Sequence, residues 1–468
     1  MKTIKKVHTG IFRDGGAGAF AKRRFRARRK KLMAKESRLM AIAGVPYGPG
    51  GKTTWAYAYC PTYQEPAMMY LTGINQNNVI LLLDPDSKVS DEILFVDSRD
   101  RKLEFWEGVR FGVGDDQSLK AVRSVTGIQD VRDIRAFKDV LKERLSKQKK
   151  KNLGTLWLEG TRRGKTCAIT TDHNYDFKKK LEGWLRSWKA PALQNIMKNH
   201  FELRLPLDKY DVANALKAQE ITGSGFKVLL KNFRNFKNEC QVQGFLEGQM
   251  LMHTPFGLSY PSIVASGSNA NILHYTKNDD DFSKNEMMLI DFGIRWMTMH
   301  ADITRTFPVS GRFNPMQKIL YEIVLGAQIA VEKKARAGVM IDELNKVCWD
   351  KISQGLEHDF TALGGKFKLQ YKGRPHGVSH LMGEQEHDGD PFRNYSQQSM
   401  KSGWMISNEP GLYGEFRLRL NGKTYDEKIG IRIEDNLVMT SGGCMNLSSK
   451  IPKTVKQIEK LMTSRKES

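Results

Sequence analysis

Short apolar runs alternate with helical periodicity through the first 190 residues. Four such runs are expected to form buried strands, at residues 39–45, 79–83, 92–97 and 155–160. Between them, residues 131–147 repeat apolar side chains at the spacing of a helix face. Alternating strands and helices predict an α/β layer domain over about residues 20–190, with a helical connection at 184–201.

The pattern changes in the second half of the chain. A long helical periodicity over 210–246 precedes short strands broken by Gly, Pro and Asn, at 261–267, 287–296 and 299–309. Two further helices are predicted at 315–336 and 341–356, and strands return at 404–413 and 429–440. We expect two domains, 1–192 and 203–450, and a loosely held basic tail at 451–468.

Composition places the chain among globular proteins. Of its 468 residues 40% are hydrophobic and 27% charged, and no apolar run approaches the roughly 20 residues that span a bilayer. The basic N-terminus lacks the apolar stretch of a secretory signal. The five cysteines are scattered and odd in number, which favours a reducing compartment and a cytoplasmic protein.

The net charge of +23 is concentrated at the N-terminus. Residues 1–40 hold fourteen Lys and Arg against two acids, Asp14 and Glu36. Such a segment can be an arm for nucleic acid or anionic lipid, a transit peptide, or a solvated basic helix. Aromatic residues are not spaced among the charges as stacking platforms for bases, so we favour the solvated helix and expect no nucleic-acid partner.

One segment resembles a phosphate-binding loop without meeting its requirements. In GVPYGPGGKTT (44–54) that motif would need glycine at position 46, which is Pro46. The glycines of an anion cradle are therefore misplaced, and we expect a surface turn.

Two aspartates introduce the candidate chemistry. If Trp296 and Met297 centre the turn of a hairpin, Asp291 pairs directly opposite Asp302, with Cβ atoms about 4.5–5.5 Å apart. Carboxylates that close repel each other unless a cation lies between them. Taken alone, the pair is also compatible with two surface aspartates of a hairpin.

Further candidate ligands lie downstream. Arg432 and Glu434 share one face of a predicted strand, and Glu409 is held extended by the proline that follows it. Three histidines fall within twelve residues of a chain that has only ten, at His376, His380 and His387.

Five segments, at 259–276, 289–313, 376–388, 408–413 and 430–436, resemble in order and spacing the motifs of the pita-bread metallopeptidases. This is the family of methionine aminopeptidase, prolidase and aminopeptidase P. Residues 70–83 and 104–112 resemble the first domain of aminopeptidase P enzymes. The resemblance implies an α+β chain, with an N-terminal α/β, creatinase-like domain followed by a C-terminal pita-bread catalytic domain.

The resemblance also implies a cage for two divalent metals. Asp291 and Asp302 would bind the first metal, His380 and Glu409 the second, and Glu434 both, with Asp302 also bridging. Four carboxylates and one imidazole favour Mn(II), with Co(II), Fe(II) or Zn(II) as alternatives.

The same resemblance implies how peptide bonds would be cleaved. A hydroxide bridging the two metals would attack the scissile carbonyl, and Glu409 would carry its proton to the leaving nitrogen. His274 and His387 would hold the substrate and stabilise the oxyanion. His376 would line the pocket for the residue after the scissile bond, and Arg432 would steady a ligating carboxylate. The acids Glu384 and Glu386 depart from the family pattern and bear on substrate choice.

The expected activity is that of a dinuclear metallo-aminopeptidase, a hydrolase that releases the N-terminal residue from Xaa-Pro peptides. The alternatives are a prolidase acting on Xaa-Pro dipeptides and a non-catalytic pita-bread binding protein. The resemblance further implies proline-containing peptide substrates and a homo-oligomer, either a dimer or a tetramer.

Overall fold

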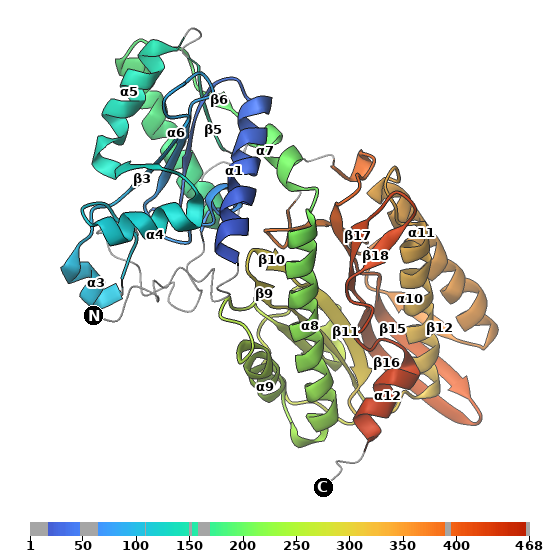
Figure 1. Ribbon diagram of the computed structural model, residues 1–468. Helices are drawn as coiled ribbons and strands as arrows, with labels where there is room; N and C mark the ends of the chain where they lie inside the picture. The colour runs from blue at the N-terminus through green and yellow to red at the C-terminus, as the bar shows by residue number, and fades with distance from the viewer. Residues whose placement is uncertain are drawn as a thin grey trace. The chain divides into compact units, whose positions relative to one another are not determined.

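A computed structural model describes residues 17–46, 64–107, 109–148, 152–157, 169–388 and 395–464. The chain divides into two compact units, Met1–Arg204 and Leu205–Ser468 (Figure 1). Sheets and helices are mixed in both units, which agrees with the predicted α+β class.

The N-terminal unit is built on a six-stranded mixed sheet in the order β4-β3-β2-β1-β5-β6. Its strands are β1 (Leu39–Ala43), β2 (Ile80–Leu83), β3 (Glu92–Val96), β4 (Asp130–Asp133), β5 (Leu153–Thr155) and β6 (Gln194–Asn195). The helices are α1 (Ala17–Lys35), α2 (Pro66–Thr72), α3 (Arg101–Glu107), α4 (Asp116–Thr126), α5 (Phe137–Lys147), α6 (Ile169–Ser187) and α7 (Met197–Arg204). The first three strands are buried along their length, as expected of continuous apolar runs.

Three sequence expectations need correction in this unit. The helix expected at 131–147 begins at Phe137, because Asp130–Asp133 pair with β3 as a parallel strand. Strand β5 ends at Thr155, and residues 158–160 of the expected strand lie outside the described residues. The connection at 184–201 is interrupted by β6, which pairs with β5. The segment resembling a phosphate-binding loop lies outside the described residues from position 47 onward.

Helix α1 is more than a solvated basic helix, so that expectation is corrected. The guanidinium of Arg29 is fully buried, pairs with Glu92 at 2.8 Å and donates to the carbonyl oxygens of Leu71 and Thr126. Buried donors of this kind need fixed acceptors, and the neighbouring elements supply them to Nη1 and Nη2 of Arg29. One face of α1 therefore belongs to the core of the unit.

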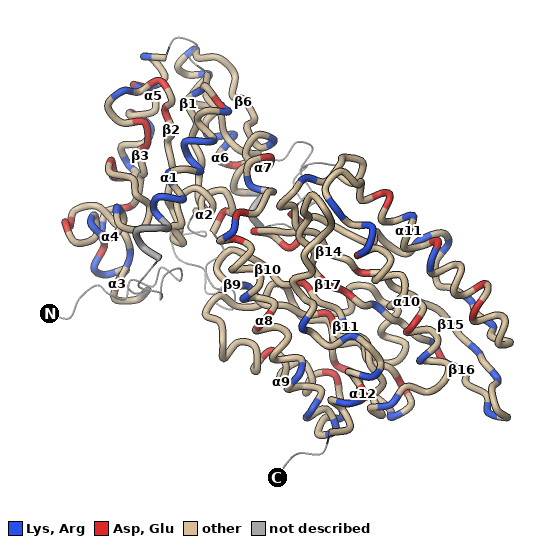
Figure 2. Tube along the Cα trace, turned by 45° about the vertical axis from the view of Figure 1, so that its right-hand side comes forward, with Lys and Arg blue, Asp and Glu red and all other residues tan. Residues whose placement is uncertain are grey.

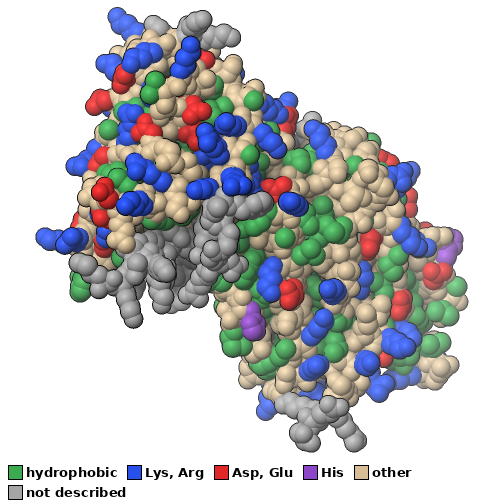
Figure 3. Space-filling view, viewed as in Figure 1, with side chains coloured by type: hydrophobic (Ala, Val, Ile, Leu, Met, Phe, Trp, Pro, Cys, Tyr) green, Lys and Arg blue, Asp and Glu red, His purple; other side chains and the backbone are tan. Residues whose placement is uncertain are grey.

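Positive charge is concentrated in the N-terminal unit. Residues 1–204 contain 41 Lys and Arg against 22 Asp and Glu, whereas residues 205–468 contain 34 against 30. Lys and Arg side chains are spread over the drawn face of this unit in Figure 3, and Lys and Arg positions recur along its helices in Figure 2.

In its described residues, the C-terminal unit contains helices, three sheets of three or four strands, and a two-stranded ribbon of β9 (Arg295–Trp296) and β10 (Met299–His300). Its helices are α8 (Lys209–Asn232), α9 (Glu239–Leu251), α10 (Pro315–Lys334), α11 (Ile341–Gln354) and α12 (Val455–Thr463). One sheet has the order β11-β8-β7, from Ile303–Pro308, Met287–Phe292 and Ile263–Ser266. The second is β12-β15-β16, from Lys366–Leu369, Gly411–Leu420 and Lys423–Arg432. The third is β13-β14-β17-β18, from Leu381–Met382, Met405–Asn408, Asp435–Met439 and Cys444–Asn446.

The long helix expected over 210–246 is two helices. Helix α8 ends at Asn232 and passes into a short 3-10 turn. Asn238 then starts α9, because its side chain accepts a hydrogen bond from the backbone N–H of Gln241.

The segment after Lys450 is not loosely held over its described residues, which corrects our expectation of a loose tail. Ile451, Ile458 and Met462 are buried, and α12 packs against α8. Arg305 and Tyr321 bind the carbonyl oxygens of Pro452 and Lys453 at 2.8 and 2.6 Å. In the described part of the chain, no helix is both long and apolar enough to cross a membrane.

Candidate metal centre

The two aspartates lie at adjacent strands, but in a different register from the one expected. In β8 and β11, Asp291 pairs with Thr304, so Asp302 lies two residues away from the predicted pairing. The ribbon of β9 (Arg295–Trp296) and β10 (Met299–His300) turns at Met297, which has a positive φ of 57°. A two-residue shift keeps side chains on the same face, so both aspartates still point to one site.

A glycine lets the chain close around this site. A Cβ atom on Gly293 would lie 1.9 Å from the carbonyl oxygen of Ala301. Any larger residue would therefore push apart the two segments that carry Asp291 and Asp302.

Tyr260 joins the two aspartates, a role that our sequence reasoning missed. Its hydroxyl lies 2.6 Å from Oδ1 of Asp291 and 2.6 Å from Oδ1 of Asp302. The residue belongs to a segment already selected for its resemblance, 259–276, but no local spacing connects it to the aspartates. Its hydroxyl thus holds one oxygen of each carboxylate, Oδ1 of Asp291 and Oδ1 of Asp302, close to the same point.

Glu434 lies just after β16, which ends at Arg432, and just before β17. Its Oε2 accepts a 2.7 Å hydrogen bond from the hydroxyl of Thr304, and its backbone N–H donates to the Thr304 carbonyl oxygen. Arg432, two residues earlier, donates to Oδ2 of Asp291 at 2.7 Å and to the Thr304 hydroxyl at 3.0 Å. Arg432 thus lies beside a candidate ligand and fixes its orientation.

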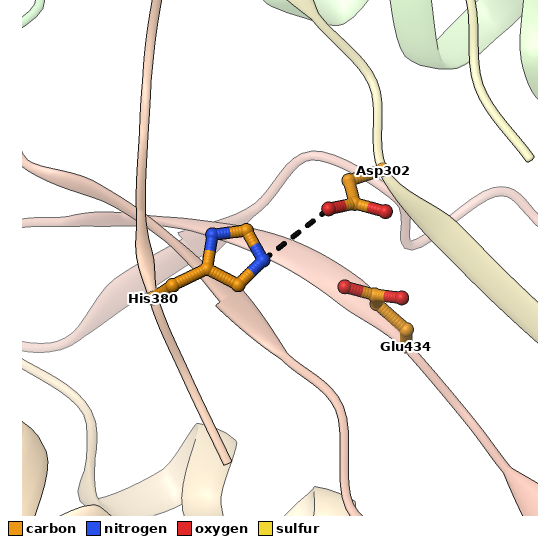
Figure 4. A group of neighbouring side chains, drawn as sticks. All are labelled: Asp302, His380 and Glu434. Atoms are coloured by element: carbon orange, nitrogen blue, oxygen red, sulfur yellow. Dashed lines mark ion pairs between the residues drawn. The ribbon is translucent and has the colours of Figure 1, made fainter. Parts of the chain in front are cut away.

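His380 and Glu409 complete the group. Nε2 of His380 lies 3.3 Å from Asp302 Oδ2 and 3.5 Å from Glu409 Oε1. The Ser407 hydroxyl donates to Glu409 and accepts from the His380 backbone N–H. Ligand atoms of Asp302, His380 and Glu434 all lie within 4.8 Å of one another, and their side chains converge in Figure 4. The candidate ligands thus come from four separate segments of the chain. They offer only carboxylate oxygens and one imidazole as ligand groups.

The electrostatics of the group fit a cation. Burial, together with the Asp302 charge, raises the pKa of Asp291 to about 7 against the opposing effect of Arg432. Burial and the surrounding carboxylates raise the pKa of Glu434 well above its usual value. Burial disfavours the charged imidazole of His380, but Asp302 and Glu409 outweigh it and raise its pKa to about 10. Each shift reflects excess negative charge out of water, which divalent ions neutralise.

The other candidate histidines lie around this group. The His387 ring stacks on His380 with a centroid distance of 4.0 Å, and its side chain is exposed. His376 lies 3.8 Å from Glu409 and packs edge-on against Trp349. Burial lowers the pKa of His376, and the charge of the exposed His274 acts in the same direction. His376 and His387 therefore border the candidate metal centre, and His274 lies close enough to His376 for its charge to act on it.

The two halves of the chain match two different family models. Residues 213–441 match metallopeptidase family M24, and residues 25–153 match the N-terminal domain of aminopeptidase P. The Xaa-Pro aminopeptidase of Haemophilus influenzae is 31% identical over 86% of this chain and 89% of its own length. The chain belongs to metallopeptidase family M24. The Xaa-Pro aminopeptidase of Escherichia coli K12 is 28% identical over 95% of this chain and 98% of its own.

Solved structures of aminopeptidases are similar to this chain over both units. Aminopeptidase PepP of Pseudomonas aeruginosa is 25% identical with a TM-score of 0.76, over 94% of this chain and 98% of its own. Aminopeptidase P of Escherichia coli, with the inhibitor Pro-Leu, is 25% identical with a TM-score of 0.74 over the same shares. The pita-bread fold and the aminopeptidase P-type first domain are confirmed. This M24 protein is a metal-dependent aminopeptidase, as the sequence led us to expect.

Proposed function

We propose that this M24 enzyme releases the N-terminal residue from peptides whose second residue is proline. The proposed metal ligands are Asp291, Asp302, His380, Glu409 and Glu434. This donor set suits two divalent ions, with Mn(II) favoured over Co(II), Fe(II) or Zn(II). Bound there, such ions would polarise the scissile carbonyl and lower the pKa of water.

Each side chain has a separate task in this proposal. Glu409, half-buried and within reach of solvent, would carry a proton from water to the leaving nitrogen. Arg432 and Tyr260 would keep the Asp291 carboxylate oriented through their 2.7 and 2.6 Å hydrogen bonds. His274 and His387 would hold the substrate and stabilise charge on its carbonyl oxygen.

His376 would line the pocket for proline. Trp349 and Tyr413 pack edge-on against its ring, so this side of the site offers flat apolar surfaces together with a hydrogen-bonding imidazole. A pyrrolidine ring, which is apolar and lacks an N–H, fits such surroundings. The inhibitor in the Escherichia coli structure, Pro-Leu, also begins with proline.

The observation that carries the proposal is the group of Asp302, His380 and Glu434, whose ligand atoms lie within 4.8 Å of one another. Glu409 lies beside His380, and Tyr260 joins Asp291 to Asp302. The chain that holds this group matches Xaa-Pro aminopeptidases over both units. The test is hydrolysis by the Mn(II)-loaded protein of Gly-Pro, Gly-Pro-Leu and the control Gly-Ala-Leu. We expect release of glycine from Gly-Pro-Leu alone. Turnover of Gly-Pro alone would favour a prolidase, and cleavage of neither proline peptide would refute the proposal.

We also propose a homo-oligomeric, cytoplasmic enzyme. The oligomer rests on resemblance to the aminopeptidase P enzymes, and the location rests on the scattered cysteines. Sedimentation at micromolar concentration is expected to give a dimer or tetramer, and a strict monomer would contradict it.

A further inference from the structure

Glu386 is an acid at the candidate metal centre that the proposed mechanism does not use. Its Oε1 lies 3.4 Å from Nε2 of His387, whose ring is stacked on His380. Its side chain is 30% exposed, against 13% for Asp291 and 5% for Asp302. Glu386 is therefore close to the site and also open to a molecule arriving from solvent.

The loop around Glu386 is held by its own hydrogen bonds. The backbone N–H of Gly383 donates to the Gln385 carbonyl oxygen at 3.0 Å, and that of Asp388 donates to the Leu381 oxygen at 2.8 Å. The Asp388 carboxylate also accepts from the backbone N–H of Glu384. These bonds anchor both ends of the turn, so Glu386 has a defined position beside the histidines.

The charge of Glu386 acts on several groups of the candidate metal centre. After burial and nearer charges, it contributes to raising the pKa of Tyr260, Asp291 and His380, which come from three separate segments. Among the residues the structure describes, its only ion-pair partner is His387, and neither Lys nor Arg neutralises it. A negative charge in this position attracts a cation on a bound ligand.

The charge of Glu386 is not among the main influences on His376, the residue proposed to contact proline. The largest charge effects on the pKa of His376 come from Glu409, Arg432 and His274. If His376 contacts proline, as the proposed function requires, the Glu386 side of the site is left for the residue before it.

We propose that Glu386 makes the enzyme selective for peptides whose first residue carries a positively charged side chain. The carboxylate would attract an arginine or lysine side chain in this subsite while the neighbouring histidines hold the peptide backbone. This inference rests on the proposed function, because it names the preferred first residue of the same reaction.

The test compares two peptides of nearly equal shape, Arg-Pro-Leu and citrulline-Pro-Leu, with the Mn(II)-loaded full chain. A partly exposed charge pair is expected to favour Arg-Pro-Leu by about threefold to fivefold in kcat/KM. Glu386→Gln should bring the ratio of the two kcat/KM values close to one, whatever common change in both peptides follows from the loss of its contact with His387. The matched control is Glu220→Gln on α8, an exposed glutamate paired with Lys217, and it should keep the wild-type ratio.

The outcomes separate this inference from the proposed function. Hydrolysis of both peptides at equal rates by the wild type would overturn the selectivity and leave the proposed function intact. Equal losses for both peptides in Glu386→Gln would also overturn it, because Glu386 would then act on the peptide backbone. No hydrolysis of either peptide by the wild type would refute the proposed function itself. In Glu386→Lys, we expect Asp-Pro-Leu to gain on Arg-Pro-Leu, and an unchanged order would contradict the inference.

Discussion

Arg305 connects the C-terminal segment to Glu434, the candidate metal ligand between β16 and β17. It is fully buried and pairs with Asp435 at 2.7 Å. Its other N–H groups donate to the carbonyl oxygens of Thr304 and Pro452 at 2.9 and 2.8 Å, and to that of Glu434. Arg305→Met keeps much of the side-chain volume but removes all of these donors.

The cost of this substitution follows from what it leaves unpaired. Breaking a buried ion pair from one side costs about 3–5 kcal/mol. Lys453 still binds the second oxygen of Asp435, so we expect the lower end, about 3 kcal/mol. Because Glu434 loses a backbone contact, metal affinity should also fall about 10–100-fold.

Hydrogen exchange of peptides covering β16 and β17 measures the local effect, and urea unfolding measures the global one. The control is Arg417→Met, since Arg417 is 64% exposed and lies 3.7 Å from Asp426. An exposed pair of this kind contributes less than about 1 kcal/mol. Equal stabilities for the two variants, or unchanged exchange in β17, would refute the reasoning.

Three further outcomes are expected. Tyr260→Phe removes a hydroxyl shared by two carboxylates. Because hydrogen bonds to charged groups contribute about 1.5–3 kcal/mol, kcat/KM should fall about 10–100-fold. Wild-type values in steady-state kinetics would contradict this. Burial lowers the pKa of His300 from 6.5 to about 3, so its contribution to stability is present above pH 6.5 and is lost as pH falls towards 3. His300→Gln should therefore reduce the pH dependence of the unfolding free energy by up to about 1.4 kcal/mol per pH unit between pH 4 and 6, and an unchanged slope would count against it. Arg29→Met leaves Glu92 buried and unpaired, so the N-terminal unit should lose about 3 kcal/mol in urea unfolding, whereas a loss no larger than that of exposed Arg135→Met would contradict the structure.

The sequence was sufficient for the elements with strong local signals. Apolar runs predicted strands β1 to β3, and the helix predicted at 315–336 corresponds to α10. Five matched motifs predicted the family. These features are visible locally because each depends on a short stretch of residues.

The remaining features depend on contacts between distant residues. The turn at Met297 lacks glycine or asparagine, so its position, and with it the pairing of Asp291 with Thr304, had no local signal. Tyr260 reaches two aspartates more than 30 residues away. The fixed C-terminal segment depends on donors such as Arg305, which no pattern near Lys450 indicates.

The central claim is that Asp291, Asp302, His380, Glu409 and Glu434 together hold two divalent ions in this M24 enzyme. Anomalous diffraction from crystals of the Mn(II)-loaded protein tests it directly, because it locates each ion independently of activity. We expect two peaks about 3.5–4 Å apart, in contact with these five side chains. A single peak, or peaks bound by other residues, would contradict the account.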